Sequence, residues 1–158
     1  MFIAIKDTKV IAIHELEWQC RREVKGLSKP EYWKWLESIT TEGVPDYSGE
    51  DYEIIETEVD VQGFNESGHI HPDKTYSLKW DASKKEVVKD DTAKAAYDLA
   101  EEWKRIRAER TRLLAETDYL ALKDNTLSTA MKEYRDKLRS IPQDNSDPYN
   151  ITWPTKPS

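Results

Sequence analysis

The chain has few of the residues on which several common protein classes depend. Its 158 residues include one cysteine, Cys20, so no intrachain disulfide can form. Five glycines leave little room for a glycine-rich phosphate-binding loop. No hydrophobic run approaches the length that spans a bilayer, and the N-terminus lacks the basic and apolar regions of a secretion signal. We therefore expect a protein that has no membrane partner and acts where it is made.

The composition is polar and acidic. Hydrophobic residues make up 37% of the chain and charged residues 35%, which is polar for a domain that buries its own core. Six tryptophans and eight tyrosines partly compensate, because each aromatic buries a large area. The net charge of −7 is uneven, since residues 1–90 carry 19 acidic and 12 basic side chains and residues 91–158 carry 12 of each. From Trp35 to Asp73 there is no Lys or Arg, and this acidity disfavours nucleic acid as a partner.

Residues 1–90 are predicted to form a small α+β domain. Helices are expected over roughly Glu15–Val24 and from Ser28, which can cap a first turn containing Pro30, to about Thr41. Short β-branched runs that alternate in polarity indicate strands, and polar turns between them indicate two hairpins. The predicted strands are Phe2–Ile5, Val10–His14, Glu53–Val61, Thr75–Trp80 and Glu86–Val88.

A long charged helix is predicted from Asp91 or Thr92 to about Glu116. Apolar residues recur along it at heptad spacing, which is consistent with a coiled coil between two or three copies and equally with a helix packed on its own domain. Its interleaved basic and acidic residues indicate a salt-bridged surface. The seam positions are Ala96, Leu99, Trp103, Ile106, Arg110 and Leu113.

A second helical stretch and an extended tail complete the predicted architecture. Ser128 can cap a helix whose apolar residues face one way, and the break at Asp118–Thr126 lets this helix fold back as a helical hairpin. After Pro142 the chain is rich in Pro, Asn, Asp and Ser and has no periodicity. Residues 91–158 therefore form a helical module with a Pro/Trp tail.

The motifs in the last third of the chain occur in a specific order. An Arg-x-x-Arg-x-x-Leu-Leu helix ends at Leu114 and is followed by a Thr-Asp-aromatic break, a Tyr-Arg-x-x-Leu-Arg helix, Ile-Pro and a terminal Trp-Pro-x-x-Pro. This ordered set resembles the C-terminal module of bacteriophage tail assembly chaperones and tail-fibre-associated proteins. The resemblance covers about residues 100–157.

The resemblance implies a non-enzymatic phage tail protein without a cofactor. Such a protein would bind a tail-fibre or baseplate protein, as an assembly chaperone in the host cytoplasm or as a structural adaptor retained in the virion tail. Residues 1–90 would then be an added docking domain, and the long helix would join the chain into a dimer or trimer. The residues expected to bind the partner are Trp103, Ile106, Arg110, Leu113, Leu114, Tyr134, Leu138, Trp153, Pro154 and Pro157.

For two of these residues, Arg110 and Trp153, we expect a specific contact. Arg110 precedes the Leu-Leu pair of the module's signature, and we expect it to contact a carboxylate or backbone carbonyls at the junction of the helical hairpin, such as Asp118. Trp153 lies in a stiff, proline-bracketed tail that can dock in a partner's groove with little loss of entropy. The alternative is that Trp153 folds back on the two helices of its own chain.

His69 and His71 are the weak candidates for a metal site. In an extended segment residues two apart point the same way, so both imidazoles could face one metal ion. No third ligand stands at a recognisable spacing, and a polar loop with two exposed histidines is the preferred interpretation. The rival function is a metal-dependent or hydrolytic enzyme that uses these histidines and the acidic residues near Glu56. Because no nucleophile with a placed base is visible, we expect no enzyme.

Overall fold

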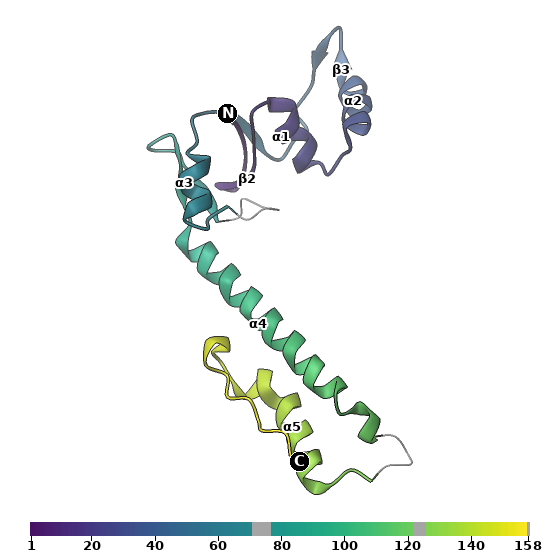
Figure 1. The fold of residues 1–158 in the computed structure, drawn as a ribbon. Helices are drawn as coiled ribbons and strands as arrows, with labels where there is room; N and C mark the ends of the chain where they lie inside the picture. The colour runs from purple at the N-terminus through teal and green to yellow at the C-terminus, as the bar shows by residue number, and fades with distance from the viewer. Residues whose placement is uncertain (71–76, 122–125, 158) are drawn as a thin grey trace. The chain divides into compact units, whose positions relative to one another are not determined.

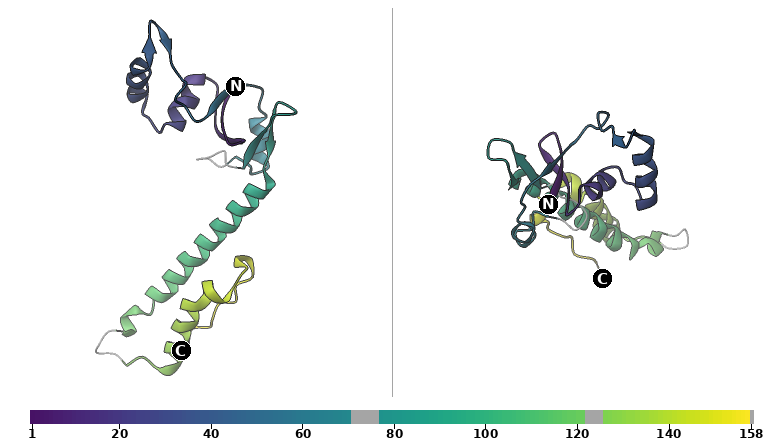
Figure 2. Two further views of the ribbon diagram at one scale, coloured as in Figure 1. Left: turned by 180° about the vertical axis from the view of Figure 1, so that it is seen from behind. Right: turned by 90° about the horizontal axis from the view of Figure 1, so that it is seen from above.

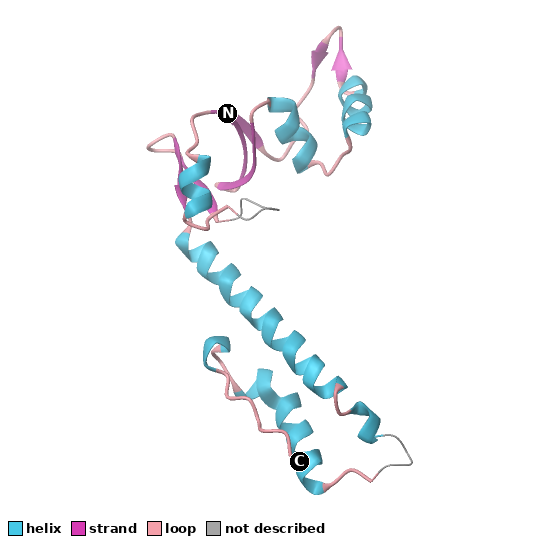
Figure 3. Cartoon of the chain, viewed as in Figure 1, coloured by secondary structure: helices cyan, strands magenta, loops and turns pink. Residues whose placement is uncertain are grey.

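The computed structural model describes residues 1–70, 77–121 and 126–157 (Figures 1 and 3). The chain forms two compact units, Met1–Ala95 and Ala96–Ser158. It contains both helices and strands, which confirms the α+β prediction.

The first unit is built on a five-stranded antiparallel sheet with the strand order β5-β1-β2-β6-β7. Both predicted hairpins, β1–β2 and β6–β7, are confirmed. One face of the sheet buries Ile3, Ile5 and Leu78. Because side chains alternate along a strand, Ala4 faces the other way, in a second cluster with Cys20 of the first helix. The strands are β1 (Phe2–Lys6), β2 (Lys9–His14), β5 (Glu53–Glu56), β6 (Leu78–Asp81) and β7 (Glu86–Lys89).

The strand predicted over Glu53–Val61 is wrong in its second half. Thr57 still exchanges backbone hydrogen bonds with Met1, but regular pairing ends at Glu56. The carboxylate of Asp60 then accepts a 2.9 Å hydrogen bond from Gly63 N and caps α3 (Val61–Glu66). Of the strand predicted over Thr75–Trp80, residues 75 and 76 lie outside the described residues.

Two helices of the first unit were predicted closely. They are α1 (Glu17–Val24) and α2 (Lys29–Ser38), and Ser28 forms a capping box with Glu31 at the start of α2. The second helix ends before Thr41. Thr40–Thr41 pairs instead as β3 with β4 (Val44–Pro45), around a turn in which Glu42 and Gly43 have positive φ.

The second unit follows the predicted order of elements. The long helix α4 (Asp91–Ala115) is followed by the short 3-10 helix η1 (Asp118–Ala121), by α5 (Thr129–Asp144) and by the 3-10 turn η2 (Pro148–Asn150). Ser128 caps α5 as predicted, through a 3.2 Å bond from Met131 N. The predicted cap of α4 is wrong by one or two residues, because Asp90 Oδ1 accepts the bond from Ala93 N.

The helical part of the second unit has one apolar core. Ile106 of α4 and Tyr134, Leu138 and Ile141 of α5 are buried together, with Leu138 completely inaccessible to solvent. Helix α5 therefore folds back beside α4, as the views in Figures 1 and 2 show. The partly buried side chains that complete this core are Trp103, Leu113, Leu114, Leu120, Leu127, Ile151 and Trp153.

Candidate partner-binding site

A buried arginine holds the junction of the helical hairpin. Arg135 of α5 is 6% exposed, and its Nη1 donates a 3.1 Å hydrogen bond to the carbonyl of Leu114 and another to Thr117 Oγ1. Its Nη2 donates a 2.8 Å bond to Asp118 Oδ1. The last carbonyls of a helix have no partner within the helix, and a cation there also interacts favourably with the helix dipole. Thr117 N and Oγ1 also donate to the Leu114 carbonyl, so Arg135 adds a charged donor at the end of α4 and connects that end to α5.

The expectation that Arg110 makes this junction is wrong. Asp118 and the end of α4 are bound by Arg135, whereas Arg110 Nε is buried and finds no hydrogen-bond partner among the described residues. A signal for Arg135 was present in the sequence. It lies four residues after Met131 and three before Leu138, so its spacing places a charge on the apolar face of α5.

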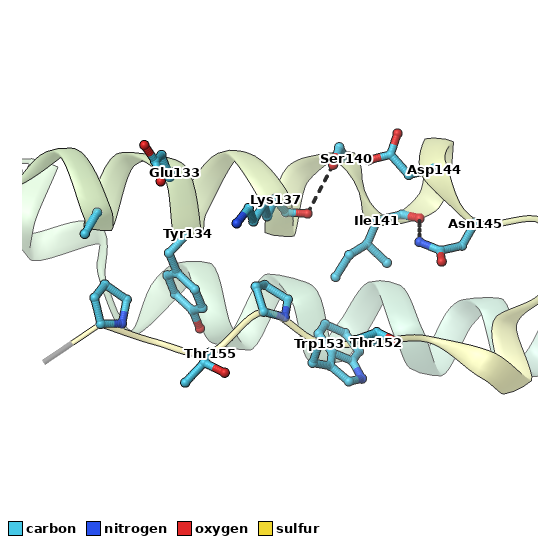
Figure 4. Close-up of a pocket in the computed structure, with 13 residues that line it drawn as sticks. Glu133, Tyr134, Lys137, Ser140, Ile141, Asp144, Asn145, Thr152, Trp153 and Thr155 are labelled. Carbon is cyan, nitrogen blue, oxygen red and sulfur yellow. Dashed lines mark hydrogen bonds between the residues drawn. The ribbon is translucent and has the colours of Figure 1, made fainter.

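The C-terminal segment 151–157 runs in an extended conformation along α5 (Figure 4). Ile151 and the half-buried Trp153 pack against the helical core. Lys156 Nζ lies 3.8 Å from Glu116 Oε2. Across the described part of the chain, no backbone hydrogen bond to another backbone group holds this segment. Side chains alone therefore attach the tail, and Trp153 folds back on its own chain, which is the second of the two arrangements considered for it.

A groove of about 590 Å³ lies between α5 and this tail. Tyr134 and Ile141 point from α5 toward the tail (Figure 4), and with Ala130, Trp153, Pro154 and Pro157 they supply the apolar part of the lining. Burial raises the pKa of Tyr134 above its ordinary value, so its hydroxyl stays neutral. The polar lining comes from Glu133, Lys137, Ser140, Asp144, Asn145, Thr152 and Thr155.

Three charged side chains of the groove are available to a partner. Glu133, Lys137 and Asp144 are exposed, and no ion pair engages them within the residues that the structure describes. Positions separated by four and by seven residues lie close to one line on a helix, so these charges form a row along α5. Elsewhere on the same helix Asp136 and Arg139 pair with each other at 2.7 Å. This row was not predicted, although the spacing of Glu133, Lys137 and Asp144 is visible in the sequence.

The residues expected to bind a partner fall into two groups. Four of them line the groove: Tyr134, Trp153, Pro154 and Pro157. Most of the others serve the core of the hairpin, where Ile106 is 2% exposed and Leu138 is inaccessible. The core group consists of Trp103, Ile106, Leu113, Leu114 and Leu138. Direct partner contact by any of them stays a prediction.

The histidine candidates do not assemble a metal site in the described residues. His69 is 6% exposed, contrary to the exposed loop that we expected. Its Nε2 lies 2.7 Å from Asp91 Oδ1, and its Nδ1 lies 3.0 Å from Ser67 Oγ. His69 thus ties the end of α3 to the start of α4, and His71 lies outside the described residues. In the parts of the chain that are described, no group of three or more potential metal ligands occurs.

Comparison with known proteins finds one family that is similar to most of the second unit. Residues 103–158 match the family model described as phage tail assembly chaperone protein, which confirms the resemblance carried by the motifs. No curated protein and no solved structure matches the chain. The match begins at Trp103 and includes the hairpin core, the Arg135 junction and the groove, and it supports a non-enzymatic role in phage tail assembly. Among the described helices, none has the length and apolar character needed to cross a membrane.

Proposed function

We propose that the chain is a phage tail protein that binds a tail-fibre or baseplate protein through its second unit. It acts as an assembly chaperone or as a structural adaptor that stays in the virion. One observation carries the proposal: the segment that matches the chaperone family folds into a unit of its own, with a groove between α5 and the tail. The described site contains no metal-ligand cluster, and binding is the activity that its chemistry supports.

The groove has the chemistry of a protein-binding surface. Protein interfaces combine an apolar centre with a polar rim, and the groove sets Trp153 and Ile141 beside the charges of Glu133 and Lys137. Fibre proteins expose apolar surfaces and strand edges before they assemble, and such surfaces aggregate unless they are covered. A chaperone that occupies one of these surfaces until assembly would prevent wrong association.

Trp153 is the proposed anchor of this interaction. It is half-buried, so it packs on the hairpin and still contributes to the lining of the groove. Tryptophans in such positions often dominate interfaces, and their truncation typically costs ~2 kcal/mol or more of binding free energy. The Arg135 junction would support the anchor indirectly, because it fixes α5 against α4.

The first unit and the exposed part of α4 extend the proposal. A domain outside the family match is consistent with an adaptor that docks on a second component of the tail.

We also propose that the chain forms a dimer or trimer through α4. Leu99 supports this idea, because it is 42% exposed on a helix with few apolar residues.

The test measures binding between the purified chain and the fibre and baseplate proteins of the same phage. Trp153→Ala and Lys137→Glu are compared with Lys132→Glu, which changes an exposed charge on α5 that does not line the groove. We expect one of these proteins to bind, and both groove variants to weaken its binding at least about tenfold. Unchanged binding by both variants, with α5 still folded by circular dichroism, would remove the groove from the interaction. Mass spectrometry of purified virions distinguishes the two roles. An adaptor that stays in the virion is detected there, and a transient chaperone is not.

A further inference from the structure

The first unit carries an aromatic surface that neither the sheet core nor the family match explains. Trp18 of α1 lies 5.5 Å from Trp33 and 5.9 Å from Tyr32 of α2, measured between ring centroids. The series continues from Tyr32 to Trp35 at 5.4 Å and from Trp35 to Tyr47 at 6.3 Å. Tyr32 is buried, whereas Trp33 is 45% exposed. The outer end of the series is therefore the exposed Trp33 with the half-buried Trp18 beside it.

A network of charges beneath the rings holds them in place. The buried guanidinium of Arg21 pairs with Glu17 and Glu50 and lies 3.6 Å from the centre of the Tyr47 ring. Lys25 also pairs with Glu50, at 3.1 Å, and its ammonium lies 4.1 Å from the Trp35 ring. These contacts connect α1, α2 and the segment after β4. Trp35 and Tyr47 are thus held in place, and Trp35 packs on Tyr32, against which Trp18 and Trp33 lie. Rings supported in this way lose less entropy when a ligand binds.

Basic side chains lie beside the two outer tryptophans. Lys29 is four residues before Trp33, on the same face of α2, and its ammonium lies 5.5 Å from the Trp18 ring. Arg22 is four residues after Trp18 on α1, and its Nε is buried without a hydrogen-bond partner among the described residues. Neither cation takes part in an ion pair in the described part of the chain. We call Trp18, Arg22, Lys29 and Trp33 the α1–α2 platform.

Most nearby carboxylates are already engaged. Glu17 pairs with Arg21, Glu23 with His14, and Glu31 with the cap of Ser28. Glu37, four residues after Trp33, and Glu15, just before α1, are exposed and pair with no cation in the described part of the chain. Arg22 and Lys29 thus place two cations without an ion pair beside the rings, within a unit that is acidic as a whole.

We propose that the α1–α2 platform binds an acidic polypeptide segment of a partner protein. An apolar or proline side chain of that segment lies across Trp18 and Trp33, and its carboxylates pair with Lys29 and Arg22. The two rings are only 5.5 Å apart and inclined by 33°, so they form a surface to lie on and leave no slot between them. Trp, Tyr and Arg are the residues that most often dominate protein interfaces.

The surrounding charge favours a short polypeptide over nucleic acid. Aromatic rings beside basic residues also bind single-stranded nucleic acid, whose affinity grows with the number of phosphates neutralised. The platform offers two cations, whereas the stretch from Trp35 to Asp73 has no Lys or Arg and repels a polyanion that extends beyond the platform. A short acidic segment covers the platform alone and avoids this repulsion.

The experiment uses the full chain and three synthetic probes of equal length. They are an acidic peptide of about ten residues with Asp and Glu around Leu-Pro, its counterpart with Lys at every acidic position, and oligothymidylate. Binding is measured by calorimetry and mapped by amide chemical shifts. The variants Trp33→Ala and Lys29→Glu are compared with Lys84→Glu, an exposed charge in the turn between β6 and β7. Circular dichroism checks that each variant folds.

We expect the acidic peptide to bind in a salt-dependent way and to shift the amides of α1 and α2. Both platform variants should weaken it at least about tenfold, and Lys84→Glu less than about twofold. Equal or tighter binding of the Lys peptide, no binding of the acidic peptide, or unchanged affinity of both platform variants would overturn the proposal. If oligothymidylate binds more tightly than the acidic peptide, the ligand of the platform is a nucleic acid and not a polypeptide. If the chain self-associates and both platform variants lose this self-association, the ligand is a second copy of the chain.

Discussion

Arg135 Nη2 donates a 2.8 Å hydrogen bond to Asp118 Oδ1 across the turn that joins the two helices of the second unit. The same guanidinium binds the carbonyl of Leu114, so one side chain connects three points of the junction, of which Thr117 is completely buried. The groove and the tail both lie on α5, and their geometry depends on this connection.

Replacing Arg135 with Ala should lower the free energy of unfolding of the second unit by about 2 kcal/mol, because the junction loses the bonds of the guanidinium to Leu114, Thr117 and Asp118. Arg135→Lys should recover part of this loss, since Lys keeps the charge but not the planar fork. The control is Arg139→Ala, whose exposed pair with Asp136 is worth less than about 1 kcal/mol. Urea unfolding followed by circular dichroism measures all three. Equal stability of Arg135→Ala and Arg139→Ala would show that the junction does not depend on Arg135.

The proposed self-association is tested best at Leu99. Ile106 belongs to the chain's own core, and Ile106→Asp should unfold the second unit, because an unpaired buried charge is costly. Leu99→Asp instead places the charge on an exposed position of α4. Light scattering should show a dimer or trimer for the original chain and a lower mass for Leu99→Asp, with thermal unfolding of the hairpin retained. An unchanged mass would exclude α4 as the contact between copies.

Cys20 should be unreactive in the folded chain. It is completely buried against β1, its Sγ donates a 3.1 Å hydrogen bond to the carbonyl of Phe2, and burial raises its pKa from 9.0 to about 11. At pH 8 the thiolate fraction is then roughly a hundredfold lower than in the unfolded chain. A disulfide reagent should label Cys20 quickly in urea and slowly without it. Labelling at equal rates in both conditions would contradict the burial.

The raised pKa of Cys20 also predicts how stability depends on pH. The folded state holds the thiol proton more tightly than the unfolded state, so this contribution to stability is complete below pH 9 and disappears as the pH rises toward 11. Urea unfolding of the first unit between pH 8 and pH 11 measures the effect. Cys20→Ala should reduce the dependence on pH, and an identical dependence in the variant would assign it to other groups.

Short-range sequence patterns correctly predicted the hairpins and the caps of α2 and α5, because these features depend on contacts between residues that are close in the chain. The β1–β2 hairpin and the caps at Ser28 and Ser128 each involve residues close in sequence. The same reasoning extended β5 too far, because the alternation continues through Val59 although Asp60 caps a new helix. There the capping signal was the stronger one, and it was overlooked.

The binding surfaces depend on residues far apart in the chain. Arg135 meets Leu114 only because the hairpin closes, and the tail reaches α5 only because Ile151 and Trp153 find the core that α4 and α5 make together. Heptad spacing on α4 could not distinguish a partner copy from α5, since both offer an apolar surface. The ordered motifs correctly predicted the family match over residues 103–158, while the role of each arginine needed the structure.

The groove of the second unit is proposed to serve phage tail assembly. The most direct measurement is the yield of infectious particles from a phage that lacks this chain, with variants supplied in trans. Lys137→Glu with Trp153→Ala should lower the yield by at least about tenfold and leave tails incomplete, whereas Lys132→Glu should restore the yield of the original chain. A full yield from the folded double variant would contradict the account.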